Sequence, residues 1–203
     1  MDTRLTPVPL VPEIRLYLAG PETGLWAGGY RSDEPLPFWA FAWPGGVALA
    51  RYVLDHPDVV AGRRVLDVGA GSGLVAIAAA RAGAARVEAV DSDARAVEAV
   101  QRNAGANGVA VVGRHQEIAH DTPTGDAEVV LVGDAFYNAA IARPLLAFLR
   151  RVGRDGADVL VSDPGRGYLP TAHFTELTTM DIAVPVVLED SPVARTTVWR
   201  LAA

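Results

Sequence analysis

The chain has 203 residues, of which 50% are hydrophobic and 21% charged, the balance of one folded domain with its own core. It contains no cysteine, so disulfides, thiolate metal sites and cysteine nucleophiles are excluded. The formal net charge of −6, with 18 basic residues that are all arginine, argues against nucleic acid as a partner. No apolar run approaches the roughly 18 residues that span a bilayer, and residues 1–10 lack a secretory-signal pattern, so we expect no membrane partner and a cytoplasmic location.

The predicted elements begin after an N-terminal extension, residues 1–36, which is rich in proline and glycine and holds one extended candidate at 13–19. A single domain is expected over residues 37–203. It opens with the aromatic stretch FWAFAWPGG, which leads into a predicted helix over 47–55 with apolar residues on one face.

From residue 64 onward, strand-like and helical patterns alternate, which implies a parallel sheet with right-handed crossovers. The expected strands are 64–68, 86–90, 109–112, 128–132 and 158–162, and the expected helices are 74–82, 94–106 and 139–151. Two further strands, 182–188 and 195–201, follow one another without a helix and predict an antiparallel hairpin. The predicted fold is therefore α/β: a Rossmann-like, seven-stranded, mostly parallel sheet with a C-terminal antiparallel hairpin and helices on both faces.

A glycine-rich loop, Gly69-Ala70-Gly71-Ser72-Gly73, follows the first of the alternating strands. Glycines let a ligand approach the backbone, and the helix that follows offers free N–H groups to a carboxylate. The G-x-G-x-G spacing differs from the G-x-G-x-x-G of dinucleotide-binding proteins. Asp67, two positions before the first glycine, suits a ligand with an ammonium group, such as the methionine end of S-adenosylmethionine.

A second acidic residue, Asp91, stands at the end of the next strand with Ser92 beside it. A carboxylate at this place accepts hydrogen bonds from both hydroxyls of a ribose. Since NAD and S-adenosylmethionine share that ribose, the glycine spacing has to discriminate between them. The alternative is a glycine-rich turn that binds no ligand.

Through VLDVGAGSG and VEAVDSD the chain resembles class I S-adenosylmethionine-dependent methyltransferases. Three further motifs, and the stretch at 37–46, are similar to the electron-transfer flavoprotein β-subunit lysine methyltransferase family: Gly133-Asp134-Ala135-Phe136-Tyr137, Ser162-Asp163-Pro164-Gly165-Arg166 and Thr197-Val198-Trp199. The resemblance covers about residues 37–199. The chain departs from the family at Asn138, where another acid is common, and residues 1–36 match no motif.

This resemblance implies methyl transfer from S-adenosylmethionine to a lysine of another protein, with the electron-transfer flavoprotein β subunit as the named candidate. A lysine must lose its proton first, and an apolar aromatic channel favours the neutral amine. Trp43, Phe136 and Tyr137 are the expected walls. Asp134, which we group with both the catalytic and the cofactor-binding residues, is expected to orient the amine; the alternative is that it only caps the helix that begins near Asn138.

Other residues leave alternatives open. Glu117, after the third strand, is expected beside adenine or is a solvated acid, and Arg166 either binds an acid of the substrate or fixes the Asp163 loop. We expect Trp43 in the site and Trp39 in the core. The histidines show no metal-ligand spacing, so no metal is expected. A small-molecule N-methyltransferase, with residues 1–36 as a lid, and a non-catalytic binding module remain the competing functions, and the oligomeric state stays open.

Overall fold

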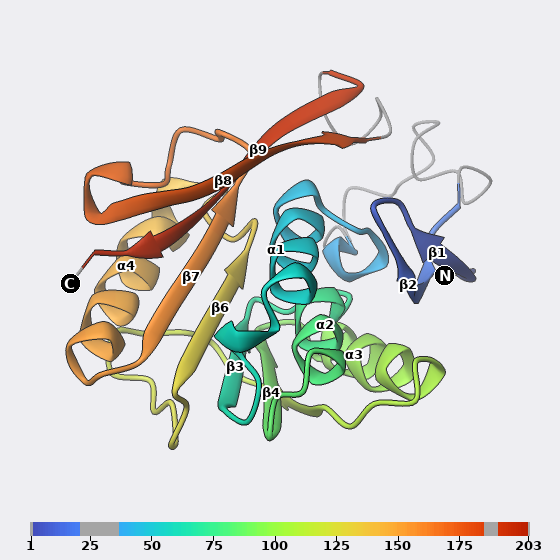
Figure 1. Ribbon diagram of the computed structural model, residues 1–203, viewed down its shortest axis with the longest axis horizontal. Coiled ribbons are helices and arrows are strands. Elements are labelled where there is room, and N and C mark those ends of the chain that lie inside the picture. Colours follow the sequence, from blue (N-terminus) through green and yellow to red (C-terminus); the bar gives the residue numbers. More distant parts are fainter. Residues whose placement is uncertain (1, 21–36, 185–190, 203) are drawn as a thin grey trace.

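The computed structural model describes residues 2–20, 37–184 and 191–202 (Figure 1). Its centre is a seven-stranded sheet in the order β5-β4-β3-β6-β7-β9-β8. The strands are β3 (Arg64–Val68), β4 (Arg86–Asp91), β5 (Val112–His115), β6 (Val129–Gly133), β7 (Asp158–Asp163), β8 (Phe174–Ala183) and β9 (Val193–Leu201). The first five pair in parallel, whereas β9 pairs antiparallel with both β7 and β8. The predicted Rossmann-like fold with its C-terminal hairpin is confirmed.

Helices cover both faces of the sheet, because side chains along each central strand alternate between two apolar layers. Val65, Val129 and Leu131 face the layer that contains α1 (Pro44–Asp55), α2 (Leu74–Arg81) and α3 (Ala94–Ala106). Leu66 and Val130 face the opposite layer, which contains α4 (Ala139–Arg154). This two-sided burial explains why the central strands are nearly continuous runs of apolar residues. Among the described residues, no helix is long and apolar enough to cross a membrane.

An N-terminal hairpin, β1 (Arg4–Val8) and β2 (Val11–Leu18), forms a separate two-stranded sheet beside α3 (Figure 1). Val8, Val11, Ile14 and Leu16 are fully buried in the core that also contains α1, α2 and α3. The described part of the predicted N-terminal extension therefore packs into the core of the domain. The predicted strand 13–19 corresponds to β2, while β1 was not predicted because Pro7 interrupts its pattern.

Most predicted boundaries lie within a few residues of the observed ones, and two differ for identifiable reasons. Strand β5 begins later than predicted because Val109 still belongs to the turn that ends α3, where its N–H bonds the carbonyl of Ala104. The strand predicted at 182–188 was wrong in position, since β8 occupies Phe174–Ala183. Residues 185–188 of that prediction lie outside the described part of the chain.

Candidate active site

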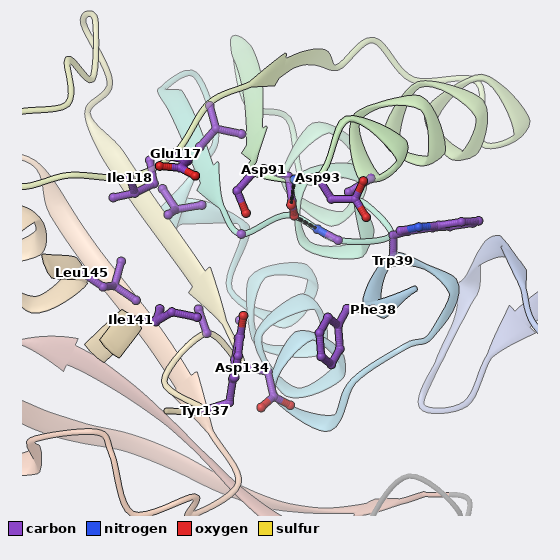
Figure 2. A pocket seen from close by; sticks show the side chains of 18 of the residues that line it. Phe38, Trp39, Asp91, Asp93, Glu117, Ile118, Asp134, Tyr137, Ile141 and Leu145 are labelled. Atoms are coloured by element: carbon purple, nitrogen blue, oxygen red, sulfur yellow. Dashed lines mark hydrogen bonds between the residues drawn. The ribbon is translucent and has the colours of Figure 1, made fainter. Parts of the chain in front are cut away.

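A cavity of about 600 Å3 lies at the carboxyl ends of β3, β4 and β6, the edge where open α/β sheets bind ligands. Its volume falls within the range of about 300–1,000 Å3 that is usual for small-molecule and cofactor sites. Figure 2 shows acidic side chains on two sides of this space, with Asp91 at one side and Asp134 at the other. Of the eleven site residues predicted from the sequence motifs, counting Asp134 once, the cavity is lined by Trp43, Gly69, Gly71, Asp91, Ser92, Glu117, Asp134 and Tyr137.

The glycine loop forms one wall of the cavity. Gly69 and Gly71 both have positive φ angles, +68° and +52°, which only glycine adopts without strain. A Cβ atom at Gly71 would meet nothing nearer than the Cα of Trp39 at 3.9 Å, so the backbone there faces open space. Gly73 differs, since its Cβ would lie 3.2 Å from Val100 of α3. This third glycine therefore serves helix packing and does not line the cavity.

Asp91 ends β4 and shapes the loop as well as the cavity. Its Oδ2 accepts the N–H of Gly71 at 2.8 Å, and its Oδ1 accepts the N–H of Asp93 at 2.9 Å. Burial raises the pKa of this carboxyl above its ordinary value, with the backbone hydrogen bonds opposing the shift. Each carboxylate oxygen retains a second acceptor position. A diol such as that of a ribose fits this arrangement.

Asp67 lies beneath the loop instead of in the cavity. The residue is 1% exposed, and its Oδ2 accepts the N–H of Ala76 in the first turn of α2 at 2.9 Å. Burial raises its pKa to about 7, and the neighbouring charge of Asp91 adds to the shift. The predicted contact with a ligand's ammonium group therefore has no direct counterpart in the cavity lining. Asp67 instead satisfies an N–H group of a helix whose N-cap residue, Gly73, has no side chain to do so.

One half of the cavity is apolar. Ile118, which follows β5, faces Ile141 and Leu145 of α4 across it, and Glu117 lies at the same end (Figure 2). A flat heteroaromatic ring such as adenine would be enclosed by these side chains. Ile141 and Leu145 were missed in the sequence because their spacing only indicates the buried face of a helix.

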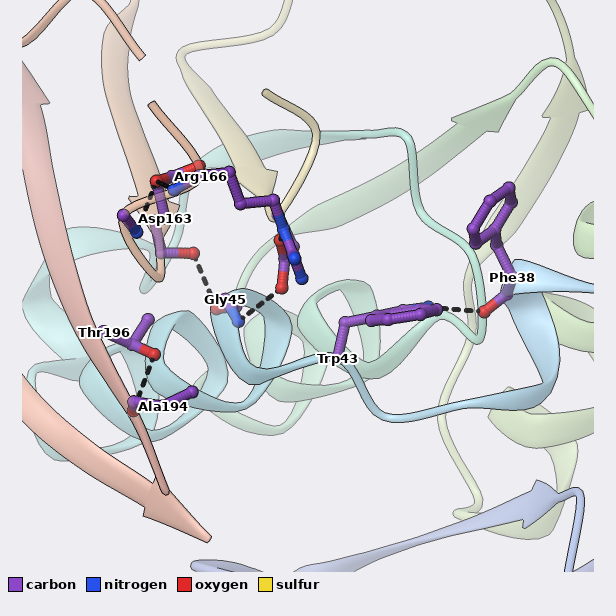
Figure 3. Close-up of polar contacts among 10 residues, drawn as sticks. Phe38, Trp43, Gly45, Asp163, Arg166, Ala194 and Thr196 are labelled. Carbon is purple, nitrogen blue, oxygen red and sulfur yellow. Dashed lines mark hydrogen bonds and ion pairs between the residues drawn. The ribbon is translucent and has the colours of Figure 1, made fainter. Parts of the chain in front are cut away.

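The other half of the cavity is aromatic. The ring of Phe38 lies 5.7 Å from that of Trp43 and 5.7 Å from that of Tyr137, measured between centroids. Nε1 of Trp43 donates to the carbonyl of Phe38 at 2.8 Å (Figure 3). Phe38 and Tyr137 are 44% and 42% exposed, so this half opens at the protein surface. Trp39, predicted in the core, also lines the cavity.

Phe136, predicted as a wall of the acceptor channel, lies in the core instead. It is fully buried and packs edge-to-face against Phe174 of β8, with ring centroids 6.5 Å apart. The side chains of Phe136 and Tyr137 leave the turn after β6 in different directions, and only Tyr137 reaches the cavity. Phe38 takes the place that had been expected for Phe136. Its position within the aromatic stretch at 38–46 was the available signal.

Asp134 connects three segments of the site. Its backbone has a φ of +60°, a left-handed conformation that aspartate tolerates better than most residues. Its Oδ1 lies 2.6 Å from Nε of Arg166, and its Oδ2 accepts the N–H of Gly45 at 2.9 Å. Asn138 caps α4, by accepting the N–H of Ile141 at 2.9 Å. The alternative in which Asp134 caps α4 is therefore wrong; the helix whose N-terminus it binds is α1.

The loop after β7 places Arg166 over the same cavity. Asp163 accepts the N–H groups of Gly165 and Arg166 at 2.7 and 2.9 Å and thereby fixes the loop through its backbone. Burial raises the pKa of the Asp163 carboxyl. The Arg166 guanidinium lies 5.7 Å from the ring centre of Trp43 (Figure 3). The Arg166 side chain thus reaches Asp134, while Asp163 fixes the loop through backbone contacts.

Comparison with known proteins extends these observations to a family. The model of the ribosomal protein L11 methyltransferase (PrmA) family matches residues 48–152. The electron transfer flavoprotein beta subunit lysine methyltransferase of Xenopus laevis is 38% identical over 207 residues, covering 97% of this chain and 82% of that protein. The Rattus norvegicus protein of the same name is 35% identical over 198 residues, covering 94% and 77%. The chain belongs to this lysine methyltransferase family.

Membership of the family confirms the resemblance stated from the motifs and identifies a class I methyltransferase. Magnesium protoporphyrin IX methyltransferase from Synechocystis, solved with S-adenosylmethionine bound, has the same fold, with a TM-score of 0.55 at 17% identity over 77% of this chain and 78% of that one. The cofactor is S-adenosylmethionine, and the cavity fits it. Gly71 leaves open space at the loop, Asp91 offers acceptors for a ribose, and Ile118 and Leu145 would enclose an adenine.

Proposed function

We propose that this protein transfers a methyl group from S-adenosylmethionine to the side-chain amine of a lysine, and that the lysine belongs to the electron transfer flavoprotein β subunit. The names of its relatives support this substrate. The observation that carries the proposal is the aromatic half of the cavity. Phe38, Trp43 and Tyr137 line a surface opening beside the buried carboxylate of Asp134, which suits a long apolar chain with an amine at its end.

The aromatic walls address the main obstacle to the reaction, which is the proton on the lysine. A free lysine side chain has a pKa of about 10.4, so deprotonation near neutral pH costs roughly 4 kcal/mol. Removing water from the amine disfavours its charged form. We infer that the proton leaves to solvent at the open end of the channel.

Asp134 orients the neutral amine in this proposal. Its two oxygens already accept from Arg166 and Gly45, which fixes the carboxylate in one position, and each oxygen keeps a further acceptor site. When bound, S-adenosylmethionine supplies a methyl carbon that its sulfonium has already activated. The contribution of the protein is therefore alignment and a defined electrostatic environment.

The competing small-molecule function requires a segment that closes over the acceptor. Of residues 1–36, the hairpin at 4–18 is attached to α3 by hydrogen bonds from Arg15 and Tyr17 to Asn107 and Asn103. The hairpin therefore packs against α3 and does not serve as the segment that closes over an acceptor. The open aromatic mouth favours a side chain presented by a protein surface.

The test is transfer of labelled methyl from S-adenosylmethionine to the purified electron transfer flavoprotein β subunit of the same organism, with the labelled residue mapped by mass spectrometry. Label on a lysine, transferred far more slowly by the Asp134→Asn variant, supports the proposal. Incubation with a whole-cell extract runs in parallel. Label confined to small molecules there would replace the lysine with a small amine acceptor, and label on a different protein would replace the flavoprotein.

A further inference from the structure

Asn103 of α3 joins two parts of the protein that are distant in sequence. The residue is 0% exposed. Its Oδ1 accepts the N–H of Tyr17 in the N-terminal hairpin at 2.8 Å, and its Nδ2 donates to the carbonyl of Ser72 in the glycine loop at 2.8 Å. Both polar atoms of one buried amide are thus used, one on the hairpin and one on the loop that lines the cavity.

The carbonyl of Ser72 needs this donor. In a continuing α-helix the N–H of Ala76 would bond the carbonyl four residues earlier, which is that of Ser72. Here Ala76 donates to Asp67 instead. Ser72 is 5% exposed, so without Asn103 its buried carbonyl would lose the one partner seen for it among the described residues.

A neighbouring asparagine bonds the hairpin and the end of α3. Asn107, the C-cap of α3, accepts the N–H of Arg15 at 3.0 Å and donates to the carbonyls of Arg15 at 2.7 Å and Asn103 at 2.8 Å. The side chains of the two asparagines thus bond the backbone of β2 in the way that the backbone of a neighbouring strand would. Only Asn103 has a second contact with the loop, and that loop is further held by Gly71, whose N–H bonds Asp91.

We propose that Asn103 is a positioning residue for the cofactor loop and that, through it, docking of the N-terminal hairpin and binding of S-adenosylmethionine stabilise each other. The proposal rests on the cofactor assignment but not on the identity of the methyl acceptor. If the hairpin fixes Asn103 and Asn103 fixes the loop, then a ligand that requires the ordered loop must also favour the docked hairpin, because such coupling is reciprocal.

The first test compares Asn103→Asp with Asn107→Asp. Each change keeps the oxygen that accepts from β2 and removes an amide donor, but only Asn103→Asp removes the donor to Ser72. Affinity for S-adenosylhomocysteine is measured by calorimetry well below the melting temperature of each variant. We expect binding to weaken about tenfold or more for Asn103→Asp, and by a clearly smaller factor for Asn107→Asp, which loosens the hairpin but leaves the donor to Ser72 in place.

Steady-state kinetics separates a positioning role from a merely structural one. Asn103→Asp should raise the KM for S-adenosylmethionine, while kcat and the KM for the acceptor change little. A variant that melts at a lower temperature but binds S-adenosylhomocysteine as tightly as the unchanged protein would overturn the proposal.

A second measurement needs no variant and so does not depend on folding of Asn103→Asp. Hydrogen exchange of the unchanged protein is followed with and without S-adenosylhomocysteine. The amide of Tyr17 should exchange more slowly when the ligand is bound, and by a larger factor than exposed amides of α4. Equal exchange of the Tyr17 amide in both states, with the ligand shown to bind, would exclude the coupling. Loss of methyl transfer to the flavoprotein alone would leave it untouched.

Discussion

Nε of Arg166 lies 2.6 Å from Oδ1 of Asp134, and this ion pair joins the loop after β7 to the turn after β6. The two side chains are 21% and 3% exposed, so the pair sits at the edge of the cavity with its carboxylate inside. The same carboxylate binds the N-terminus of α1 through Gly45. One aspartate therefore connects the motif of β6, the motif of β7 and the aromatic stretch that leads into α1.

Replacing Asp134 with asparagine should separate its catalytic contribution from its structural one. Asparagine tolerates the positive φ of this position and retains an acceptor for Gly45, but it removes the charge that holds Arg166. We expect kcat to fall roughly 100-fold or more through lost alignment, with the Kd for S-adenosylhomocysteine nearly unchanged. Single-turnover assays and calorimetry measure the two quantities.

Asp134→Ala is the comparison for this variant. It also removes the acceptor at the N-terminus of α1 and should lower the free energy of unfolding by about 1 kcal/mol more than the asparagine variant does. If either variant lost cofactor binding instead of turnover, Asp134 would belong with the cofactor and not with the acceptor.

Phe136 and Tyr137 are adjacent in sequence but should respond in opposite ways to truncation. Phe136→Ala removes a fully buried ring and should cost about 3–5 kcal/mol of stability. Tyr137→Ala removes a ring that is 42% exposed at the cavity and should change stability by less than about 1 kcal/mol while raising the acceptor KM. Urea unfolding measures the stability of each variant, and acceptor titrations measure its KM. A large stability loss for Tyr137→Ala would assign it to the core.

The pKa of Asp67 predicts a specific dependence of stability on pH. Burial raises this pKa from 3.8 to about 7 in the folded protein. Below pH 3.8 the Asp67 carboxyl is protonated in both the folded and the unfolded states, so its contribution to the free energy of unfolding is complete. Between pH 3.8 and about 7 that contribution is lost, because the carboxyl ionises in the unfolded state before it does so in the folded state. Asp67→Asn cannot ionise and retains an acceptor for Ala76. The variant should therefore gain stability relative to the unchanged protein as pH rises towards 7.

Urea unfolding at several pH values measures this difference. A constant offset between Asp67→Asn and the unchanged protein would contradict the assignment. Cofactor affinity of the same variant tests the expected interaction with the methionine ammonium. Weaker binding would support that interaction, and unchanged binding would leave Asp67 with its contact to α2 alone.

Sequence patterns predicted the sheet better than the direction of individual side chains. The alternation of strands and helices, the glycine loop and Asp91 follow from local periodicity and spacing, and the structure has them at those places. Phe136 and Tyr137 could not be distinguished, because which of two adjacent aromatic residues turns inward depends on how the turn after β6 packs on β8. The role of Asn103 requires the hairpin and the loop to meet, which a pattern within α3 does not record.

Two adjacent glycines of α1, Gly45 and Gly46, differ in how closely they approach the turn after β6. A Cβ atom at Gly45 would lie 2.7 Å from the backbone nitrogen and 2.9 Å from the Cα of Asp134, whereas one at Gly46 would meet nothing within 4 Å. Gly45 is also bound on both sides, since its N–H donates to Asp134 and its carbonyl accepts from Oγ of Ser162 at 2.6 Å. Gly45 therefore cannot move away from Asp134 without also breaking its hydrogen bond with Ser162.

Gly45→Ala should therefore displace Asp134, lower the free energy of unfolding by about 1–3 kcal/mol and reduce kcat together with it. Gly46→Ala lies in the first turn of the same helix and should be neutral, or stabilising by up to about 1 kcal/mol, because alanine favours a helix over glycine. Thermal unfolding and methyl-transfer rates of the two variants test this. If Gly45→Ala were as stable and as active as Gly46→Ala, the contact between α1 and Asp134 would not control the geometry of the acceptor site, and the alignment attributed to Asp134 would have to come from Arg166 alone.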